Sequence, residues 1–302
     1  MRHLDITMTT PARRALIGCA VAVFAALSAM VSGATARAQA AGVSAGDLDI
    51  GQALQSALSG QASALSPQDM IGMEFPVSAW GDEFLFALFE GSTFLDPNAP
   101  MGVPAPPANE SVETQAELVA LLEMQRSERT PVALTQIAIE NLPGLFPADL
   151  FEIHGLLPSR EDAPSLWAVL DAVDNEARFF VMREKLLWSR ARPYALETAL
   201  RTEVLPPQHA SYPSAHATEY AALAEILSIL NPACAATYRA LSNDVGHRRE
   251  IAGVHYPSDT TAGIALGNRV ARTLYDDGHL EALIDRLKND VAAGTTPRPD
   301  CG

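Results

Sequence analysis

Cysteine is scarce in this sequence, which holds only three among 302 residues. Cys19 lies in an apolar run near the N-terminus, so Cys234 and Cys301 are the two that remain in the rest of the chain. An oxidising compartment would permit a disulfide between them, but their positions in the sequence do not show that they come close enough in space. The sequence leaves this bridge open.

Long hydrophobic runs are missing after residues 1–40, because no later stretch reaches the ~18 unbroken apolar residues that a membrane span needs. Residues 1–40 have the order of a secretory signal peptide: Arg13 and Arg14 come first, an Ala-rich apolar run follows, and small residues end the segment. We expect cleavage after Ala40, with Ala36 marking an alternative site, and export to a bacterial periplasm or out of the cell. An uncleaved membrane anchor is the competing interpretation, and the short, Ala-dominated run disfavours it.

Positive charge is also in short supply. The chain has 21 Lys and Arg against 36 Asp and Glu, and without residues 1–40 the balance is 17 against 35, a formal charge of −18. A surface this acidic repels nucleic acid and anionic membranes, so we expect no nucleic-acid partner and no stable membrane association. The sequence likewise contains no His-x-Glu-x-x-His motif and no Asp-rich metal-binding run.

The composition is that of a folded protein, since 48% of the residues are hydrophobic and 19% are charged. Beyond the N-terminal segment the pattern indicates one helix after another, with no convincing series of alternating strands. We therefore predict an all-α fold, a helical bundle. The predicted helices span 47–58, 82–89, 112–127, a helix that starts at Thr130-Pro131, 164–191, 214–230, 231–246, 258–275 and 281–291.

A proline-rich segment interrupts this series of helices. Residues 97–107 hold five prolines in eleven positions, which forbids a regular helix there. Such a segment is either a linker between two domains or a loop that lies over a single domain. Because the segments on both sides look helical, we prefer the loop and predict one domain over residues 41–302.

Basic residues gather in one short stretch of this acidic chain, just before Pro193. Lys185 and Arg192 are seven residues apart, which is about two helical turns, so in a continuous helix both side chains point the same way. Arg183 and Arg190 add positive charge nearby. Taken alone, this stretch is typical of a solvated basic face at the C-terminus of a helix, where cations are favoured.

A second stretch, Tyr212-Pro213-Ser214-Ala215-His216, marks the start of a helix. A helix N-terminus offers unpaired backbone N–H groups and the positive end of the helix dipole, and both suit an anion. His216 lies in the first turn, beside any anion bound there. The plainer interpretation is that Ser214 is only a cap and that His216 is a surface histidine.

A third stretch places Arg249, His255 and Asp259 within eleven residues. A carboxylate four residues after a histidine can hold the imidazole in one tautomer, which leaves the other ring nitrogen free to act as a nucleophile. Arg249 supplies a planar fork of donors that matches phosphate oxygens. The plainer interpretation is a loop histidine followed by an acid in the first turn of a helix.

Together the three stretches resemble the motif of the type 2 phosphatidic acid phosphatase superfamily, and most closely that of its soluble bacterial branch, the class A non-specific acid phosphatases. The motif has Lys, six residues and Arg-Pro, then Pro-Ser-Gly-His, then Ser-Arg, five residues, His, three residues and Asp. The positions that match at the required spacings are Lys185, Arg192, Pro193, Pro213, Ser214, His216, Arg249, His255 and Asp259.

Two positions depart from that motif. Ala215 replaces the usual Gly, which would cost about 1 kcal/mol if the backbone required a positive φ there and nothing in the first turn of a helix. Arg248 replaces the usual Ser before Arg249, so a hydroxyl is lost and a cation is gained. Neither departure removes a group that attacks phosphorus or transfers a proton, and we expect activity to persist.

The resemblance implies a fold, the helical bundle of the acid phosphatase and vanadium haloperoxidase type, and an activity. The implied enzyme hydrolyses small phosphate monoesters through a phosphohistidine and needs no metal or other cofactor. By resemblance, His255 is the nucleophile, Asp259 orients it, and His216 protonates the leaving oxygen and then activates water. The implied phosphate-binding residues are Lys185, Arg192, Ser214, Ala215 and Arg249.

The same motif leaves other functions open. Vanadium-dependent haloperoxidases of the superfamily hold vanadate with the same residues, although their chains are typically much larger. Membrane lipid phosphatases carry the motif on transmembrane helices, which are not predicted here, yet phospholipid head groups stay open as substrates. A phosphate-binding protein with a decayed site is a further alternative, motivated by Arg248 and Ala215. The acidic charge and the habit of the superfamily suggest a homodimer.

Overall fold

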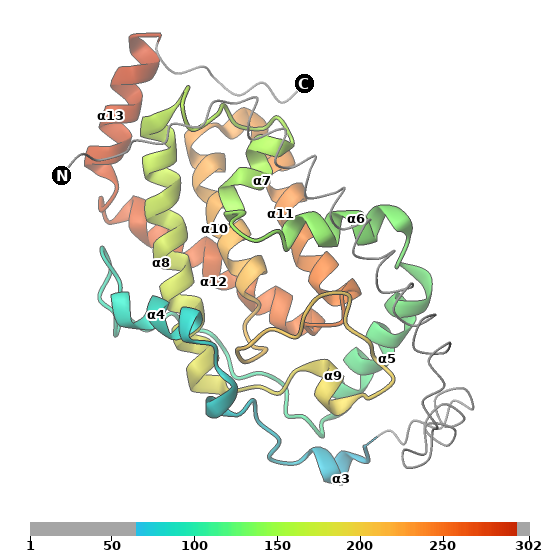
Figure 1. Ribbon diagram of the computed structural model, residues 1–302. Helices are drawn as coiled ribbons and strands as arrows, with labels where there is room; N and C mark the ends of the chain where they lie inside the picture. The colour runs from blue at the N-terminus through green and yellow to red at the C-terminus, as the bar shows by residue number, and fades with distance from the viewer. Residues whose placement is uncertain (1–64, 295–302) are drawn as a thin grey trace, which may run out of the picture. The chain divides into compact units, whose positions relative to one another are not determined.

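The computed structural model describes residues 65–294, and in that part of the chain the regular structure is helical (Figure 1). The β-type pairing among these residues is limited to an isolated antiparallel bridge between Glu74 and Arg190. The predicted all-α class is therefore confirmed. The expected signal peptide and the predicted helix over residues 47–58 lie outside the described residues.

The helices follow one another with short connections. In chain order they are α3 (Pro67–Met70), a 3₁₀ turn (Val77–Ala79), α4 (Asp82–Glu90), α5 (Val112–Ser127), α6 (Pro131–Glu140), α7 (Pro147–Ile153), α8 (Pro164–Trp188), α9 (Pro193–Leu196), α10 (Ala215–Leu230), a 3₁₀ turn (Pro232–Cys234), α11 (Ala235–Ile251), α12 (Pro257–Asp276) and α13 (Glu281–Ala292).

Side-chain caps explain why two of these helices begin where they do. The Ser111 hydroxyl accepts a hydrogen bond from the Thr114 N–H at 3.1 Å and so caps α5. The Thr130 hydroxyl accepts one from the Ala133 N–H at 3.2 Å, with Pro131 at the first helical position of α6. Each cap satisfies a backbone donor that the first turn leaves unpaired.

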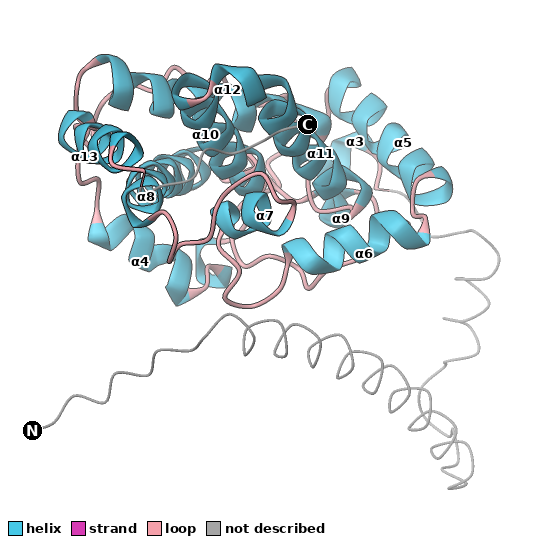
Figure 2. Cartoon of the chain, turned by 90° about the horizontal axis from the view of Figure 1, so that it is seen from above, coloured by secondary structure: helices cyan, strands magenta, loops and turns pink. Residues whose placement is uncertain are grey.

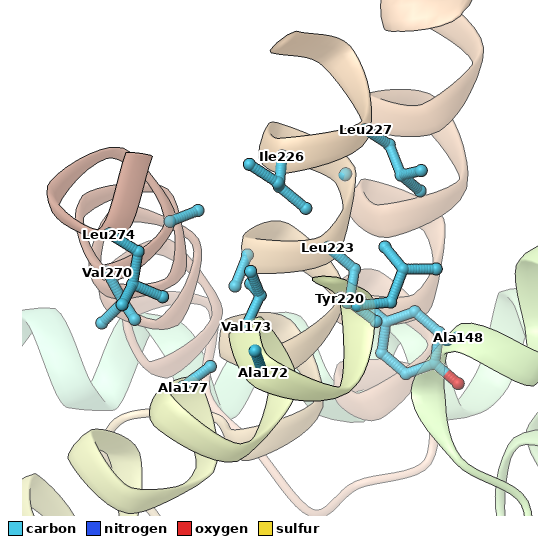
Figure 3. Close-up of a cluster of buried hydrophobic side chains, with 14 of the residues drawn as sticks. Ala148, Ala172, Val173, Ala177, Tyr220, Leu223, Ile226, Leu227, Val270 and Leu274 are labelled. Carbon is cyan, nitrogen blue, oxygen red and sulfur yellow. The ribbon is translucent and has the colours of Figure 1, made fainter. Parts of the chain in front are cut away.

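Helix α10 lies at the centre of the bundle, where it packs against α7, α8, α11 and α12 (Figures 1 and 2). Figure 3 shows the core that joins three of them: Leu223 and Ile226 of α10 lie among Val173 of α8 and Val270 and Leu274 of α12. All five side chains are fully buried. Burying each of them contributes about 1.5–3 kcal/mol, so this core fixes the three helices relative to one another.

Helices α10 and α12 approach closely because α12 carries glycine where they cross. A Cβ on Gly263 would lie 2.7 Å from the Ser214 carbonyl oxygen, and a Cβ on Gly267 would collide with the Thr218 carbonyl. The close packing sets the starts of the two helices side by side, with the Ser214 N–H donating to the Asp259 carbonyl at 3.0 Å. Two of the three motif stretches meet at this point.

Helix α8 ends earlier than predicted. It was expected to reach residue 191, but it stops at Trp188 because Ser189 takes a left-handed conformation with φ of 45°. The chain then runs in extended form, and the Arg190 carbonyl accepts a hydrogen bond from the Ser211 N–H at 2.9 Å. Pro193 restricts only the residue before it. The turn at Ser189 and the hydrogen bond to Ser211 therefore end the helix, and the proline does not.

Helix α11 ends later than predicted. The sequence predicts that the helix ends at Gly246, but this glycine lies inside it. A Cβ at that position would come 2.7 Å from the Thr260 side chain. The chain leaves the helix after Ile251, close to Gly253, which has a φ of 75°. Its first residues form a 3₁₀ turn, so α11 itself begins at Ala235. Short helices α7 and α9, each with proline at its first position, were not predicted.

The proline-rich segment 97–107 packs onto the helices. Arg183 of α8 donates to the carbonyl oxygens of Pro97 and Ala99 at 2.7 and 2.9 Å, and the Tyr212 hydroxyl donates to the Pro104 carbonyl at 2.7 Å. These contacts tie the segment to α8 and to the loop before α10. The contacts agree with a loop that lies over the helices, and one domain over residues 41–302 stays a prediction.

Two further sequence expectations concern the cysteines and the membrane. Cys234 is disulfide-bonded, while Cys301 lies outside the described residues. Among residues 65–294, no helix combines the length and the apolar character that a bilayer crossing requires.

Candidate active site

Lys185 lies in the last turn of α8 and is completely buried. Its Nζ donates to the carbonyl oxygens of Ala210 and Ser211 at 2.8 and 2.9 Å. Arg190 and Arg192 are buried as well, with 4% and 1% of their surface exposed. The alternative of a solvated basic face is therefore wrong.

Arg192 follows α8 in extended backbone, so it does not share a helical face with Lys185 as the spacing predicted. The turn at Ser189 brings the two cations together instead. The Arg192 guanidinium donates to the His209 carbonyl at 3.0 and 3.1 Å and to the Val254 carbonyl at 2.6 Å. Backbone acceptors from two separate segments thus hold this charge in place.

His255 is 2% exposed, and its two ring nitrogens have different partners. Nδ1 lies 3.0 Å from Oδ2 of Asp259, and Nε2 lies 3.0 Å from Nη1 of Arg192. Because a guanidinium only donates hydrogen bonds, Nε2 must accept, and Nδ1–H must donate to the carboxylate. His255 is therefore a neutral imidazole with its lone pair on Nε2. Burial and the charge of Arg192 hold the pKa of His255 well below its ordinary value, which maintains this form.

Asp259 is completely buried and accepts several hydrogen bonds besides that of His255. Oδ2 accepts from the Ser211 hydroxyl at 2.5 Å and from the Tyr256 N–H at 3.1 Å, and Oδ1 accepts from Nη1 of Arg190 at 2.7 Å. Burial raises the pKa of Asp259, but Arg190 and the donors around it outweigh burial and lower that pKa. Asp259 stays ionised and able to hold the Nδ1 proton.

Arg190 is a residue whose position at the site sequence reasoning missed, because it was noted only as added charge. Its guanidinium contacts Glu117 at 3.1 Å and Ser258 at 2.8 Å in addition to Asp259, and it lies 3.8 Å from the ring centroid of Tyr256. A signal was available: side chains two apart in extended backbone point to the same side, so Arg190 shares the orientation of Arg192. His209 gave no such signal, yet its Nδ1 lies 3.1 Å from Nη2 of Arg192.

Helix α10 begins directly after Ser214, whose hydroxyl accepts from the Ala217 N–H at 3.4 Å. Ala215 is the first residue of the helix, and among the described non-glycine residues only Ser189 has a positive φ. The replacement of Gly by Ala215 therefore causes no backbone strain. His216 is partly exposed and stacks on Tyr220, with ring centroids 6.3 Å apart and planes 9° apart.

Arg249 is 1% exposed in the last turn of α11, and its Nη2 donates to the carboxylate of Glu140 at the end of α6. Arg248 donates to the same carboxylate through Nε at 2.5 Å. Burial raises the pKa of Glu140, and the two arginines oppose the shift. The single negative charge of Glu140 thus faces two positive charges. Because Arg248, which departs from the motif, also binds this carboxylate, Glu140 does not fully neutralise Arg249, and the three side chains together carry a net positive charge.

The cations and histidines of the site suppress one another's protonation. Burial and Arg192 hold the pKa of Lys185 well below its ordinary value. Burial and Arg249 lower the pKa of His216 to about 3, and burial and Lys185 lower that of His209. A bound oxyanion would compensate these positive charges, so the electrostatics of the cluster favour an anion.

A cavity of about 710 Å³ opens onto this cluster. Of the predicted residues, Ala215, His216, Arg249 and His255 line it. The structure brings all eight predicted residues into one connected group. The other four lie behind the lining and are buried; they are Lys185, Arg192, Ser214 and Asp259. The arrangement is an unprotonated imidazole nitrogen beside fixed positive charge and a helix N-terminus, which suits an oxyanion.

One solved structure is similar to this chain in fold, and a second shows a weaker likeness. The chain is similar to the first bacterial vanadium-dependent iodoperoxidase of known structure, with a TM-score of 0.51 and 13% identity over 60% of this chain and 54% of that one. It is also similar to a transmembrane PAP2-type phosphatidylglycerolphosphate phosphatase from Bacillus subtilis, with a TM-score of 0.42 and 19% identity over 68% of this chain and 97% of that one. The chain spans about half the length of the iodoperoxidase, and that likeness is one of fold.

The segment that carries the site also matches a family. Residues 177–279 fit the PAP2 superfamily, and they contain Lys185, His216, His255 and the rest of the predicted site. The fold expected from the motif is the fold observed. The match to the PAP2 superfamily covers 103 of the 302 residues.

Proposed function

We propose that this protein is an acid phosphatase that hydrolyses small phosphate monoesters through a phosphohistidine at His255. One observation carries the proposal: Asp259 accepts a hydrogen bond from Nδ1–H, so the lone pair of neutral His255 is on Nε2, beside Arg192 at the cavity. Displacement at phosphorus needs an aligned nucleophile and fixed positive charge around the phosphoryl oxygens. Both requirements are met by side chains of this protein.

The phosphoryl oxygens would bind to Lys185, Arg192 and Arg249. Lys185 and Arg192 are already fixed by backbone carbonyls, so little conformational freedom is lost when a phosphate binds. The Ser214 hydroxyl and the N–H of Ala215 at the start of α10 add donors and the positive end of the helix dipole. We also propose that these groups suffice without a metal ion.

The reaction then proceeds in two displacements. Nε2 of His255 attacks phosphorus in line while the bond to the ester oxygen breaks, and that oxygen takes a proton from His216. In the second step His216 removes a proton from water, which attacks phosphorus as the bond to Nε2 breaks. Inorganic phosphate leaves with the proton that His216 took from water, and both histidines return to their neutral forms.

The proton that His216 donates must arrive with the substrate. The pKa of His216 is lowered to about 3, so this residue is neutral in weak acid. A phosphate monoester carries one proton below its second pKa of about 6. Binding of that monoanion to the cations favours transfer of its proton to His216, which predicts an acid pH optimum.

Export completes the proposal. We propose that residues 1–40, which lie outside the described residues, are removed and that the enzyme acts in the periplasm or outside the cell. N-terminal sequencing of the protein recovered from the periplasm and the culture medium tests this part, and a chain that still begins at Met1 contradicts it.

Turnover of p-nitrophenyl phosphate is the experiment that tests the activity. Hydrolysis should persist in EDTA and should be inhibited competitively by phosphate and by vanadate, which mimics the five-coordinate transition state. A parallel assay measures bromide, chloride and iodide oxidation by peroxide with added vanadate. Halide oxidation without ester hydrolysis would identify a vanadium-dependent peroxidase, and phosphate binding without either reaction would identify a binding protein.

A further inference from the structure

A second cavity, of about 330 Å³, adjoins the one above His255. Phe84, Asn141, Met182, His216 and Glu219 line both cavities. His216 therefore stands between the space where the phosphoryl group would bind and a second space beyond it. In an in-line displacement the leaving oxygen lies opposite the nucleophile, so the leaving group would extend past His216 towards this second cavity.

Glu219 faces the same two cavities from α10. It follows His216 by three residues, and side chains at that spacing share a helical face. Its ion pair is with Arg178, Nε to Oε1 at 3.7 Å, whereas Arg178 makes a closer contact of 2.9 Å to Asp174. Two carboxyl groups thus compete for one guanidinium, and the side chain of Glu219 is only 12% exposed.

The charge state of Glu219 follows from this competition. Burial and the negative charge of Asp174 raise the pKa of Glu219, while Arg178 and Lys185 oppose the shift. The other charged or titratable groups around the two cavities are Glu140 on α6, Tyr220 on α10, Arg249 on α11, and His209, His216 and His255. In weak acid Glu219 is therefore a neutral carboxylic acid, which both donates and accepts hydrogen bonds.

We propose that the second cavity is the leaving-group subsite and that Glu219 sets its response to charge: neutral Glu219 admits hydroxyl-bearing and anionic alcohols alike, whereas ionised Glu219 favours the uncharged, hydroxyl-bearing alcohols. The proposal rests on the proposed function, because it takes the leaving oxygen to lie beside His216. Asn141 and Glu219 offer polar contacts for hydroxyl groups, and Phe84 and Leu142 cover the carbon chain. Ionised Glu219 would repel a carboxylate or a second phosphate in the same space.

The test compares two phosphate esters of matched size. Glucitol 6-phosphate and gluconate 6-phosphate differ at one end of the chain, where the first has a hydroxyl and the second a carboxylate. Their binding is measured calorimetrically on His255→Ala, which lacks the proposed nucleophile and leaves the esters intact. The phosphate group is common to both, so its own ionisation cancels in the ratio of the two dissociation constants.

Glu219 ionises as the pH rises from about 5 to about 9. We expect the dissociation constant of the gluconate ester to increase about tenfold relative to that of the glucitol ester over this range. In the double variant His255→Ala with Glu219→Gln the ratio should stay constant, since glutamine keeps the hydrogen bonds without the charge. The matched control is the double variant His255→Ala with Glu123→Gln, on the exposed face of α5, and it should behave like His255→Ala alone.

Two results would overturn the proposal: a ratio that does not change with pH, or one that changes equally with and without Glu219. Inorganic phosphate separates this failure from failure of the proposed function. If phosphate binds but neither sugar ester does, the leaving-group subsite is wrong while the oxyanion site stands. If phosphate does not bind either, the proposed function fails together with the subsite.

Discussion

The two histidines of the candidate site lie in contrasting surroundings. His255 is 2% exposed, with Asp259 on one ring nitrogen and Arg192 on the other. His216 is partly exposed, stacks on Tyr220 and lines two cavities. The difference teaches how the fold divides the proposed chemistry: one histidine is fixed in a single tautomer before any ester binds, and the other faces the space where the ester would lie.

The surroundings of the two histidines also differ in charge. Asp259 stays ionised beside Arg190, so the His255 side combines a buried anion with buried cations. On the His216 side Glu219 has a raised pKa, because burial and Asp174 disfavour its charge. The charges around His255 fix the proposed nucleophile in one protonation state. Near His216, Glu219 can gain or lose a proton in the working pH range.

The largest effect is expected at the nucleophile. His255→Ala should reduce turnover of p-nitrophenyl phosphate to below about one percent of wild type, because the covalent route is lost. A thermal melt of the variant checks that the fold is intact, which the buried core of α8, α10 and α12 should ensure. Turnover above that level with a normal melt would show that another group attacks phosphorus.

On the other side, His216→Ala should distinguish between leaving groups. An alkyl phosphate expels a basic oxygen that needs a proton, so its hydrolysis should fall by about 10²–10⁴-fold. Formation of the phosphoenzyme from p-nitrophenyl phosphate should fall much less, since p-nitrophenolate leaves without much help. Rapid-quench kinetics with both esters measures the two losses. Equal losses for both esters would mean that His216 is not the acid.

Removal of Arg190 should damage the His255 side through Asp259. Arg190→Met leaves a buried carboxylate without its cation, and breaking such a pair typically costs about 3–5 kcal/mol of unfolding free energy. Because the pKa of Asp259 is lower in the folded protein than in the unfolded chain, its ionised form stabilises the fold above the unfolded pKa, and this stabilisation is lost as the pH falls. The variant, which lacks it, should unfold at a higher pH than wild type in an acid titration. Arg190→Lys is the control, and it should recover part of the loss.

The pH profile should sharpen the account of the His216 side. If the proton arrives with the ester, kcat/KM should fall about tenfold per pH unit above the second pKa of the substrate, which lies at about 6 for phosphate groups. Esters with different second pKa values should then shift the position of this fall. If kcat/KM begins to fall at the same pH for every ester, the proton is already bound to the enzyme before the ester binds.

Most of the helices in residues 65–294 were predicted from the sequence, and the roles of the predicted site residues stay predictions. Helix α5 was predicted to the residue from the helical spacing of Leu118, Leu121 and Leu122, and the Ser111 cap explains why it begins there. The end of α8 could not be predicted, since it depends on a hydrogen bond between Arg190 and Ser211, which belong to separate segments. The local sequence shows where a helix can end, and contacts with distant segments determine where it ends.

The contacts that shape the site were the least predictable. Arg190 reaches Asp259 across 69 residues, and Arg249 reaches Glu140 across 109. Nothing in the spacing of these residues predicts either pair, because both depend on how separate helices pack. The His255–Asp259 contact was predictable, since four residues of separation at a helix start suffice to bring the side chains together.

The most direct test of the central claim is to trap the covalent intermediate. His216→Ala is mixed with p-nitrophenyl phosphate, quenched within milliseconds to seconds, and digested for mass spectrometry. The account predicts an acid-labile, alkali-stable phosphate that accumulates on His255, because the water that should release it has lost its base, and predicts none in His255→Ala. A phosphate on any other residue, or a full burst of p-nitrophenol with no phosphate on the protein, would contradict it.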